Sequence, residues 1–238
     1  MKLQGRIFYS VLDATVYLVN GDEEFGLIDT GFVRSFPEHL RTFHAHGLKV
    51  KKIKKIFVTH AHCDHIGGLA LAKKKLGAVA CAHPLAARYI ERGDKTILAA
   101  HLEFCAHHEV CPRCSIELLL EDKKTIEIGT VSLQVFHTPG HTPGSIALRL
   151  EEYLFVGDTI FRGGGIGWID VHWGSNPQDY LKTLKLIESI EPAIVCPAHG
   201  RPFRFKKKII KDAIKKVEFY LDPCNGFGMP RPKRAKEL

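Results

Sequence analysis

The feature that most constrains this chain is a polar segment that directly follows an apolar one. Residues 53–59 read Ile-Lys-Lys-Ile-Phe-Val-Thr, the pattern of a buried strand, and three histidines and an aspartate follow within six positions: His60, His62, Asp64 and His65. Polar groups beside a buried strand need partners, because burying them unpaired costs free energy. Imidazoles and a carboxylate suit zinc or iron, so the segment predicts a metal site.

The spacing inside this segment predicts two directions for its side chains. His60 and His62 are two residues apart and, in an extended turn, can point toward one ion. Asp64 and His65 fall on the next bend and can face a neighbouring ion. Two glycines then allow a tight turn into a helix, whose N-terminal positive potential helps to keep Asp64 ionised.

Three more candidate ligands each end a strand-like segment. They are His141, in a turn with two Pro-Gly pairs, Asp158 and His199. A single residue of this kind is usually a cap or turn residue, and it is the cluster at 60–65 that favours metal binding. The candidate metal ligands are therefore His60, His62, Asp64, His65, His141, Asp158 and His199.

The rest of the chain alternates between strand-like and helix-like segments. A hairpin is predicted over 15–31, and residues 25–31 and 153–159 are both apolar strands that deliver an Asp-Thr pair, which suggests two similar β-rich halves packed sheet to sheet. No low-complexity linker divides the chain, so we expect one domain over 1–238 with a basic C-terminal helix and tail at 204–238. Further strands are predicted at 78–82, 116–120, 125–128, 131–136, 145–150 and 193–196, and helices at 35–46, 68–76, 84–92, 177–190 and 206–221.

Composition excludes several classes of protein. With 238 residues, 45% of them hydrophobic, the chain is not disordered and needs no disulfide to fold. No apolar run approaches the roughly 20 residues that span a bilayer, and Asp13 interrupts any signal-peptide core, so we expect a cytoplasmic protein with no membrane partner. The net charge of +8 lies in local clusters, which indicates solvated helix faces and a tail, with nucleic-acid binding as the alternative.

The metal-ligand motifs, taken in order, resemble the metallo-β-lactamase-fold superfamily. The pattern His60-x-His62-x-Asp64-His65 with Gly67-Gly68, then His141, Asp158 and His199, follows the family's order from about residue 10 to about residue 203. Asp29 matches the family's early buried acidic residue, which is structural and orients the metal loop. The resemblance implies an α/β fold, a four-layer αββα sandwich of two mixed β-sheets flanked by helices.

The resemblance also implies a dinuclear site. One ion would be bound by His60, His62 and His141, the other by Asp64, His65 and His199, and Asp158 would bridge them. Two divalent ions, zinc with iron or manganese as alternatives, would lower the pKa of a shared water and so supply a hydroxide nucleophile. Asp64 would be the catalytic residue that orients the hydroxide and takes its proton.

Among the chemistries of this family, the sequence favours hydrolysis of a thioester, lactone or related ester-like bond in a small molecule. Residues 157–170 are similar to the glycine turn of compact glyoxalase II-like hydrolases, although Trp168 stands where those enzymes usually carry Arg. Only residues 203–238 remain for a glutathione-binding region, which argues against a glutathione thioester. The alternatives are a mononuclear iron persulfide dioxygenase and a metal-dependent nuclease or nucleic-acid-binding protein.

Two further groups have candidate roles. Trp168, His172 and Trp173 form an aromatic turn that would serve as a substrate wall or pack on the following helix. Cys105, Cys111 and Cys114, the last two in a CxxC pair, would hold a second, structural metal, with a redox pair or reduced core thiols as alternatives. The sequence does not indicate whether the chain dimerises.

Overall fold

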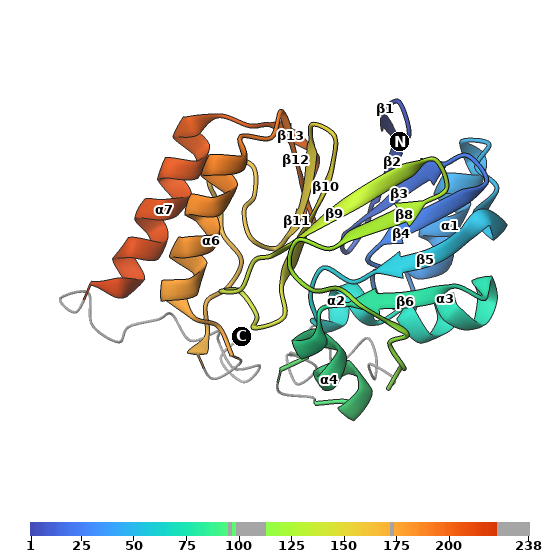
Figure 1. Ribbon diagram of the computed structural model, residues 1–238, viewed down its shortest axis with the longest axis horizontal. Helices are drawn as coiled ribbons and strands as arrows, with labels where there is room; N and C mark the ends of the chain where they lie inside the picture. Colours follow the sequence, from blue (N-terminus) through green and yellow to red (C-terminus); the bar gives the residue numbers. More distant parts are fainter. Residues whose placement is uncertain (95–96, 99–112, 172–173, 223–238) are drawn as a thin grey trace, which may run out of the picture.

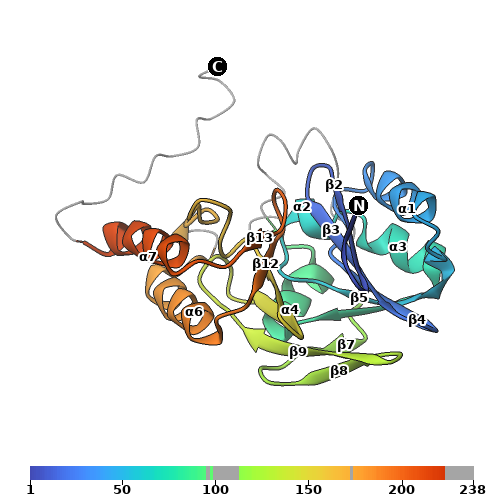
Figure 2. The ribbon, with the colours of Figure 1, turned by 90° about the horizontal axis from the view of Figure 1, so that it is seen from above.

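The protein is a sandwich of two β-sheets with helices on both outer faces (Figure 1). The computed structural model describes residues 1–94, 97–98, 113–171 and 174–222. Seen from above, helices α6 and α7 lie on one side of the sheets and α1 and α3 on the other (Figure 2). The predicted four-layer αββα sandwich is therefore confirmed.

The first sheet has seven strands in sequence order, and it is mixed. Its strands pair antiparallel from β1 to β4 and parallel from β4 to β7. The predicted hairpin is formed by β3 and β4, with Asp22 at the turn in the left-handed region, at a φ of 72°. The strands are β1 (Lys2–Gln4), β2 (Ile7–Val11), β3 (Thr15–Gly21), β4 (Glu24–Ile28), β5 (Ile53–Phe57), β6 (Val79–Ala82) and β7 (Leu118–Leu119).

The second sheet has six strands in the order β13-β12-β11-β10-β9-β8. Only β11 and β12 pair parallel, so this sheet is also mixed. Because parallel neighbours end at the same edge, the residues that follow β11 and β12 come together there. The strands are β8 (Thr125–Ile128), β9 (Val131–His137), β10 (Ile146–Leu150), β11 (Tyr153–Gly157), β12 (Ile194–Pro197) and β13 (Phe203–Arg204).

Local signals mark the starts of two of the helices. Both α4 and α6 start with a proline, and the side chain that precedes each proline accepts a hydrogen bond from the first turn. No helix in the described part of the chain is long and apolar enough to cross a membrane. The helices are α1 (Phe36–Ala45), α2 (Cys63–Ile66), α3 (Leu69–Leu76), α4 (Pro84–Arg92), α6 (Pro177–Ile190) and α7 (Lys207–Leu221), with a 3-10 turn η1 at Val50–Lys52.

Three apolar clusters hold the layers together, and alternation along the strands assigns residues to them. In β3, Val16 and Leu18 face the helices of the first sheet, whereas Tyr17 and Val19 face the second sheet. On the other side, Ile210, Ala213 and Val217 bury the apolar side of α7, with its lysines outside. This packing agrees with the solvated helix faces that the charge clusters indicate.

Candidate metal centre

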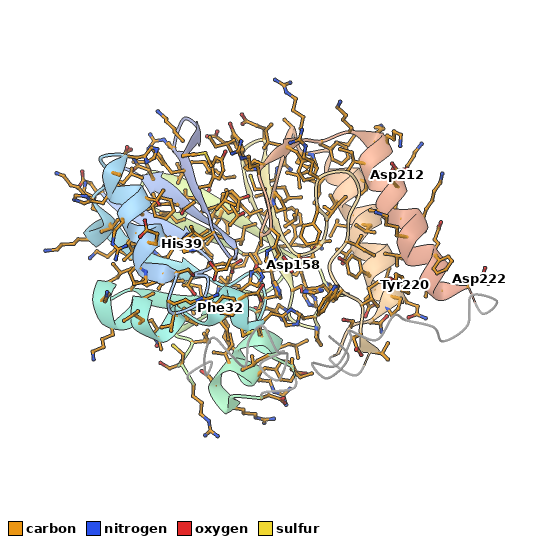
Figure 3. The ribbon with its side chains drawn as sticks, turned by 180° about the vertical axis from the view of Figure 1, so that it is seen from behind. Phe32, His39, Asp158, Asp212, Tyr220 and Asp222 are labelled. Atoms are coloured by element: carbon orange, nitrogen blue, oxygen red, sulfur yellow. The ribbon has the colours of Figure 1, made fainter. Side chains whose placement is uncertain are left out.

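The seven predicted ligands converge at one edge of the sandwich. His60 follows β5, Asp158 follows β11 and His199 follows β12, while His141 lies in the loop between β9 and β10. Figure 3 shows Asp158 near the middle of the molecule. The ligand atoms form three overlapping groups, each within 4.8 Å: His60, His62 and His141; His60, His65 and Asp158; and Asp64, His65 and His199.

The first group consists of imidazoles alone. His62 Nδ1 lies 3.0 Å from His141 Nε2, and the ring centroid of His60 is 4.7 Å from that of His62 and 4.8 Å from that of His141. His141 Nδ1 donates to the carbonyl of Trp168 at 2.8 Å, so in a neutral ring Nε2 carries a lone pair into the group.

The second group combines carboxylates with imidazoles. His199 Nε2 lies 3.2 Å from Asp64 Oδ2 and 3.4 Å from Asp158 Oδ2, and His65 Nε2 lies 3.4 Å from Asp64 Oδ2. Asp158 faces both groups, because its Oδ2 is also 3.7 Å from His141 Nε2 and its Oδ1 is 3.7 Å from His65 Nε2.

The two groups differ in charge. Burial holds the pKa of His60 well below its usual range, lowers that of His62 to about 3 and also lowers that of His141. These three rings are therefore neutral at pH 7, the form in which imidazole binds metals.

Carboxylates reverse this effect in the second group. Burial opposes a charge on His65 and His199, but nearby carboxylates outweigh it, raising the pKa of His65 well above its usual range and that of His199 to about 10. Burial likewise opposes ionisation of Asp64 and Asp158, but the neighbouring imidazoles outweigh it. His65 holds the pKa of Asp64 well below its usual range. His65 and His199 together lower the pKa of Asp158 to about 2. Without a metal, protons on the imidazoles balance the carboxylates, and a cation would displace those protons.

Four buried polar atoms at this edge have no hydrogen-bond partner among the residues that the structure describes: His60 Nε2, His62 Nε2, His65 Nε2 and Asp158 Oδ1. Such atoms are rare in native interiors, and a cluster of them calls for a bound group. Neutral imidazoles on one side and carboxylates on the other are donors that divalent cations accept. The residues present therefore fit a metal centre.

Asp29 anchors the segment that carries the first ligands. Its Oδ1 accepts from the Thr59 amide at 2.8 Å, and its Oδ2 accepts from Thr59 Oγ1 at 2.7 Å and from His65 Nδ1 at 3.0 Å. Asp29 itself has a φ of 59°, a left-handed conformation that Asp tolerates better than most residues. These contacts hold His65 with Nε2 directed toward the carboxylates.

Asp13 positions His199, and sequence reasoning missed this role. The Asp13 carbonyl accepts from His199 Nδ1 at 3.1 Å, while Asp13 Oδ2 accepts from the Phe32 amide at 2.7 Å and from Ser35 Oγ at 2.8 Å. The fully buried His39 ring lies beside this carboxylate, with Nε2 3.6 Å from Asp13 Oδ1. Asp13 stands between two strands with no local motif around it, so only the fold reveals the contact.

Tyr180 and Gly167 support the loop after Asp158. Tyr180 Oη lies within hydrogen-bond distance of the carbonyls of Asp158 and Thr159, at 2.9 and 2.7 Å, and accepts from the Gly167 amide at 3.0 Å. A Cβ at Gly167 would lie 2.3 Å from the Asp158 carbonyl oxygen and 2.8 Å from His141 Nδ1. The backbone can pass this close to two ligands only because residue 167 is a glycine.

The other predicted site residues are only partly described. Trp168 is 55% exposed, and its carbonyl holds His141, while His172 and Trp173 lie outside the described residues. Cys105 and Cys111 also lie outside them. Cys114 is buried, and burial raises the pKa of its thiol, as expected for a reduced core cysteine.

Comparison with known proteins gives matches over most of the chain. The family model described as the metallo-beta-lactamase superfamily matches residues 9–199. Acyl-coenzyme A thioesterase MBLAC2 of Gallus gallus is 30% identical over 225 residues, which cover 84% of this chain and 77% of that protein.

Among solved structures, the FEZ-1 metallo-beta-lactamase of Legionella gormanii superposes with a TM-score of 0.79 at 19% identity, covering 96% of this chain and 97% of that one. The class B3 di-zinc metallo-beta-lactamase LRA-12 from an Alaskan soil metagenome gives a TM-score of 0.73 at 22% identity, covering 92% and 90%. At these identities the two structures establish the fold.

Proposed function

The chain belongs to the metallo-beta-lactamase superfamily, and from its donor cluster we propose that it is a metal-dependent hydrolase that cleaves coenzyme A thioesters. The observation that carries the proposal is the convergence of seven imidazole and carboxylate side chains, with four of their buried atoms unpartnered. The thioester is favoured by the likeness to MBLAC2, a protein named as an acyl-coenzyme A thioesterase.

We assign the ligands of two ions by the groups in which they lie. His60, His62 and His141 would hold one ion, and Asp64, His65 and His199 the other, with Asp158 facing both. Zinc suits this donor set, and the fold neighbour LRA-12 is described as a di-zinc protein. When bound, two such ions lower the pKa of a water molecule and polarise a carbonyl.

The residues of the chain would supply orientation and proton transfer. Asp64 lies 3.2 Å from His199 Nε2, and its lowered pKa keeps it a carboxylate, able to accept a proton from the attacking water. As the water oxygen adds to the thioester carbonyl carbon and the C–S bond breaks, one proton of the water passes to Asp64 and the first products are a carboxylic acid and a thiolate. The carboxylic acid then loses its proton to solvent, and Asp64 returns its own proton to solvent or to the thiolate. An ordinary thiol has a pKa of about 8.5, so its thiolate is a fairly stable anion at neutral pH. The thiolate can therefore leave without a residue that donates a proton to it.

The proposal is tested by following thiol release from acyl-coenzyme A substrates of graded chain length, with the zinc-reconstituted protein. Lactones, β-lactams and phosphodiesters serve as comparison substrates. We expect thioester turnover that disappears in the metal-free protein and returns when zinc is added. Thioester cleavage no faster with the zinc-loaded protein than without protein would overturn the proposal. Faster turnover of a phosphodiester, or oxygen-dependent turnover of a persulfide, would replace it with one of the alternative activities.

A further inference from the structure

A surface hollow between α7 and the loop after Asp158 is not used by the chemistry described above. Its volume is about 350 Å³, and it is lined by Ile166, Lys215, Lys216, Phe219 and Tyr220. The four helical residues are two pairs spaced four apart, so they lie on one side of α7. The lining therefore combines two ammonium groups with two aromatic rings, and none of its five residues is acidic.

The aromatic side chains of the hollow are partly exposed, and their rings meet edge to face with centroids 6.1 Å apart. Phe219 is 57% exposed and Tyr220 is 40% exposed, and both belong to the small set of exposed large apolar side chains in the described part of the chain. Exposed apolar surface of this kind beside charged groups is typical of binding sites.

The lysines of the hollow have few partners among the described residues. Earlier in α7, Lys207 pairs with Glu191 at 2.5 Å and Lys208 pairs with Asp212 at 2.6 Å. Lys215 and Lys216 form no ion pair with any residue that the structure describes. Lys216 Nζ donates one hydrogen bond, to the Gly164 carbonyl at 2.7 Å, which leaves two of its three N–H groups for a ligand.

The hollow shares a loop with the metal centre. The Gly164 end of this loop packs against α7, because a Cβ there would lie 3.0 Å from Asp212 Cβ. The other end reaches the ligands, because the Gly167 amide donates to the Asp158 carbonyl at 3.0 Å and the Trp168 carbonyl accepts from His141. Ile166 is two residues from Trp168, so their backbones are at most about 7 Å apart.

We propose that this hollow binds the nucleotide end of a coenzyme A thioester, with the adenine on Phe219 or Tyr220 and the phosphates on Lys215 and Lys216. The inference rests on the proposed thioesterase function. Coenzyme A carries an adenine and phosphates at the end of a long, flexible arm remote from the thioester. Aromatic side chains stack on bases, and lysine binds phosphate as a point charge, so the lining matches that end of the molecule.

The test compares two substrates with the same acyl group, an acyl-coenzyme A and the matching acyl-pantetheine, which lacks the nucleotide. In the Lys215→Ala/Lys216→Ala double variant we expect KM for acyl-coenzyme A to rise about tenfold or more, with kcat nearly unchanged. Hydrolysis of acyl-pantetheine should stay as in the unaltered protein in the Lys215→Ala single variant, which keeps the contact of Lys216 with the Gly164 carbonyl. The matched control is Lys208→Ala/Lys211→Ala, which removes two charges from the same helix and should leave KM unchanged.

A binding experiment measures the affinity of the hollow without relying on turnover. It changes only the aromatic residues, so the contact of Lys216 with the loop stays in place. Adenosine 3′,5′-bisphosphate is titrated calorimetrically into the zinc-loaded protein and into Phe219→Ala and Tyr220→Ala variants. We expect binding that at least one of these variants weakens severalfold. If no thioester is hydrolysed but this binding is seen, the proposed function fails and the hollow remains a nucleotide site.

Equal kcat/KM for the two thioesters in the unaltered protein, or bisphosphate binding that neither the lysine pair nor the aromatic residues affect, would overturn the inference and leave the thioesterase function standing. A second result would also overturn the inference. If the protein does not bind the bisphosphate but binds RNA in a salt-dependent way, and the lysine double variant loses this RNA binding, the hollow is a nucleic-acid site.

Discussion

His199 donates a hydrogen bond from Nδ1 to the main-chain carbonyl of Asp13, 3.1 Å away. The contact fixes the tautomer of His199 and directs Nε2 toward Asp64 and Asp158. The adjoining backbone is held as well, because the Thr15 amide donates to the Ala198 carbonyl at 2.6 Å. The segment that leads into β3 therefore supports a candidate ligand, His199, that lies 186 residues after Asp13 in the sequence.

This support predicts the effect of changing Asp13. Asp13→Ala removes the acceptor of the Phe32 amide and Ser35 hydroxyl, so the carbonyl that holds His199 loses its anchor. We expect the affinity for the ion at Asp64, His65 and His199 to fall about 10- to 100-fold. The affinity for the ion at the three-histidine group, which is His60, His62 and His141, should be unaffected. A two-step Co²⁺ titration followed by absorption measures both affinities.

Asp13→Asn is the matched control, because its amide oxygen can still accept both hydrogen bonds. It should bind both ions nearly as the unaltered protein does. A merely structural role for Asp13 would weaken both ions equally in Asp13→Ala, and that result would contradict the prediction.

Gly167 gives a prediction about the three-histidine group. Gly167→Ala would place a Cβ 2.3 Å from the Asp158 carbonyl oxygen, so the loop that presents the Trp168 carbonyl to His141 must shift. We expect a loss of about 1–3 kcal/mol in the free energy of unfolding, together with reduced metal content. Gly165→Ala is the control, since its nearest contact would be an ordinary 3.4 Å. Equal behaviour of the two variants in thermal unfolding and metal analysis would refute this reading.

His83 makes stability depend on pH. Its ring stacks on that of His137, with centroids 4.0 Å apart, and burial, followed by the charge of His137, lowers the pKa of His83 to about 4. The unfolded chain binds this proton more tightly, with a pKa of about 6.5, so the stabilising contribution is present above about pH 6.5 and is lost as the pH falls toward 4.

The measurement is urea unfolding at about pH 7 and about pH 5. His83→Asn retains an acceptor for the Leu85 amide, which His83 Nδ1 now caps at 3.3 Å. Between these two pH values the variant should lose less stability than the unaltered protein. An identical loss in both proteins would show that His83 does not titrate as described.

Metal removal should lower thermal stability. A ligand that binds only the folded chain at 100 times its Kd adds about 2.7 kcal/mol to the free energy of unfolding. For a chain of this size that corresponds to a Tm about 5 °C or more higher with zinc than after chelation. Calorimetry with and without chelator checks this, and an unchanged Tm would mean that the four unpartnered atoms do not bind a cation.

The sequence predicts most elements because their signals are local. Helices α4 and α6 have the predicted bounds, since each begins with a proline after a capping side chain and ends at a left-handed residue, Gly93 or Glu191. The seven candidate ligands could be named from the sequence because they cluster or lie shortly after strands, and the structure brings them together. The short helix α2 was missed: Asp64 and His65 were expected on a bend, and four residues are too few to show helical periodicity.

What could not be predicted depends on contacts between distant segments. Neither the support of His199 by Asp13 nor the hollow of α7 has a local motif, because each is created by packing of one layer against another. A single domain over 1–238, the cytoplasmic location and the glyoxalase II-like subtype stay predictions.

The most direct test of the central claim is metal analysis combined with thioester turnover in one set of samples. The zinc-reconstituted protein should hold about two ions per chain, and Asp64→Ala about one, with most of the thioester turnover lost. The Asp64→Asn variant has a side chain of nearly the same shape, so it controls for loss of turnover caused by misfolding. It should also lose most of the turnover. One ion per chain in the unaltered protein, or full turnover in a variant that holds a single ion, would contradict a two-ion hydrolase.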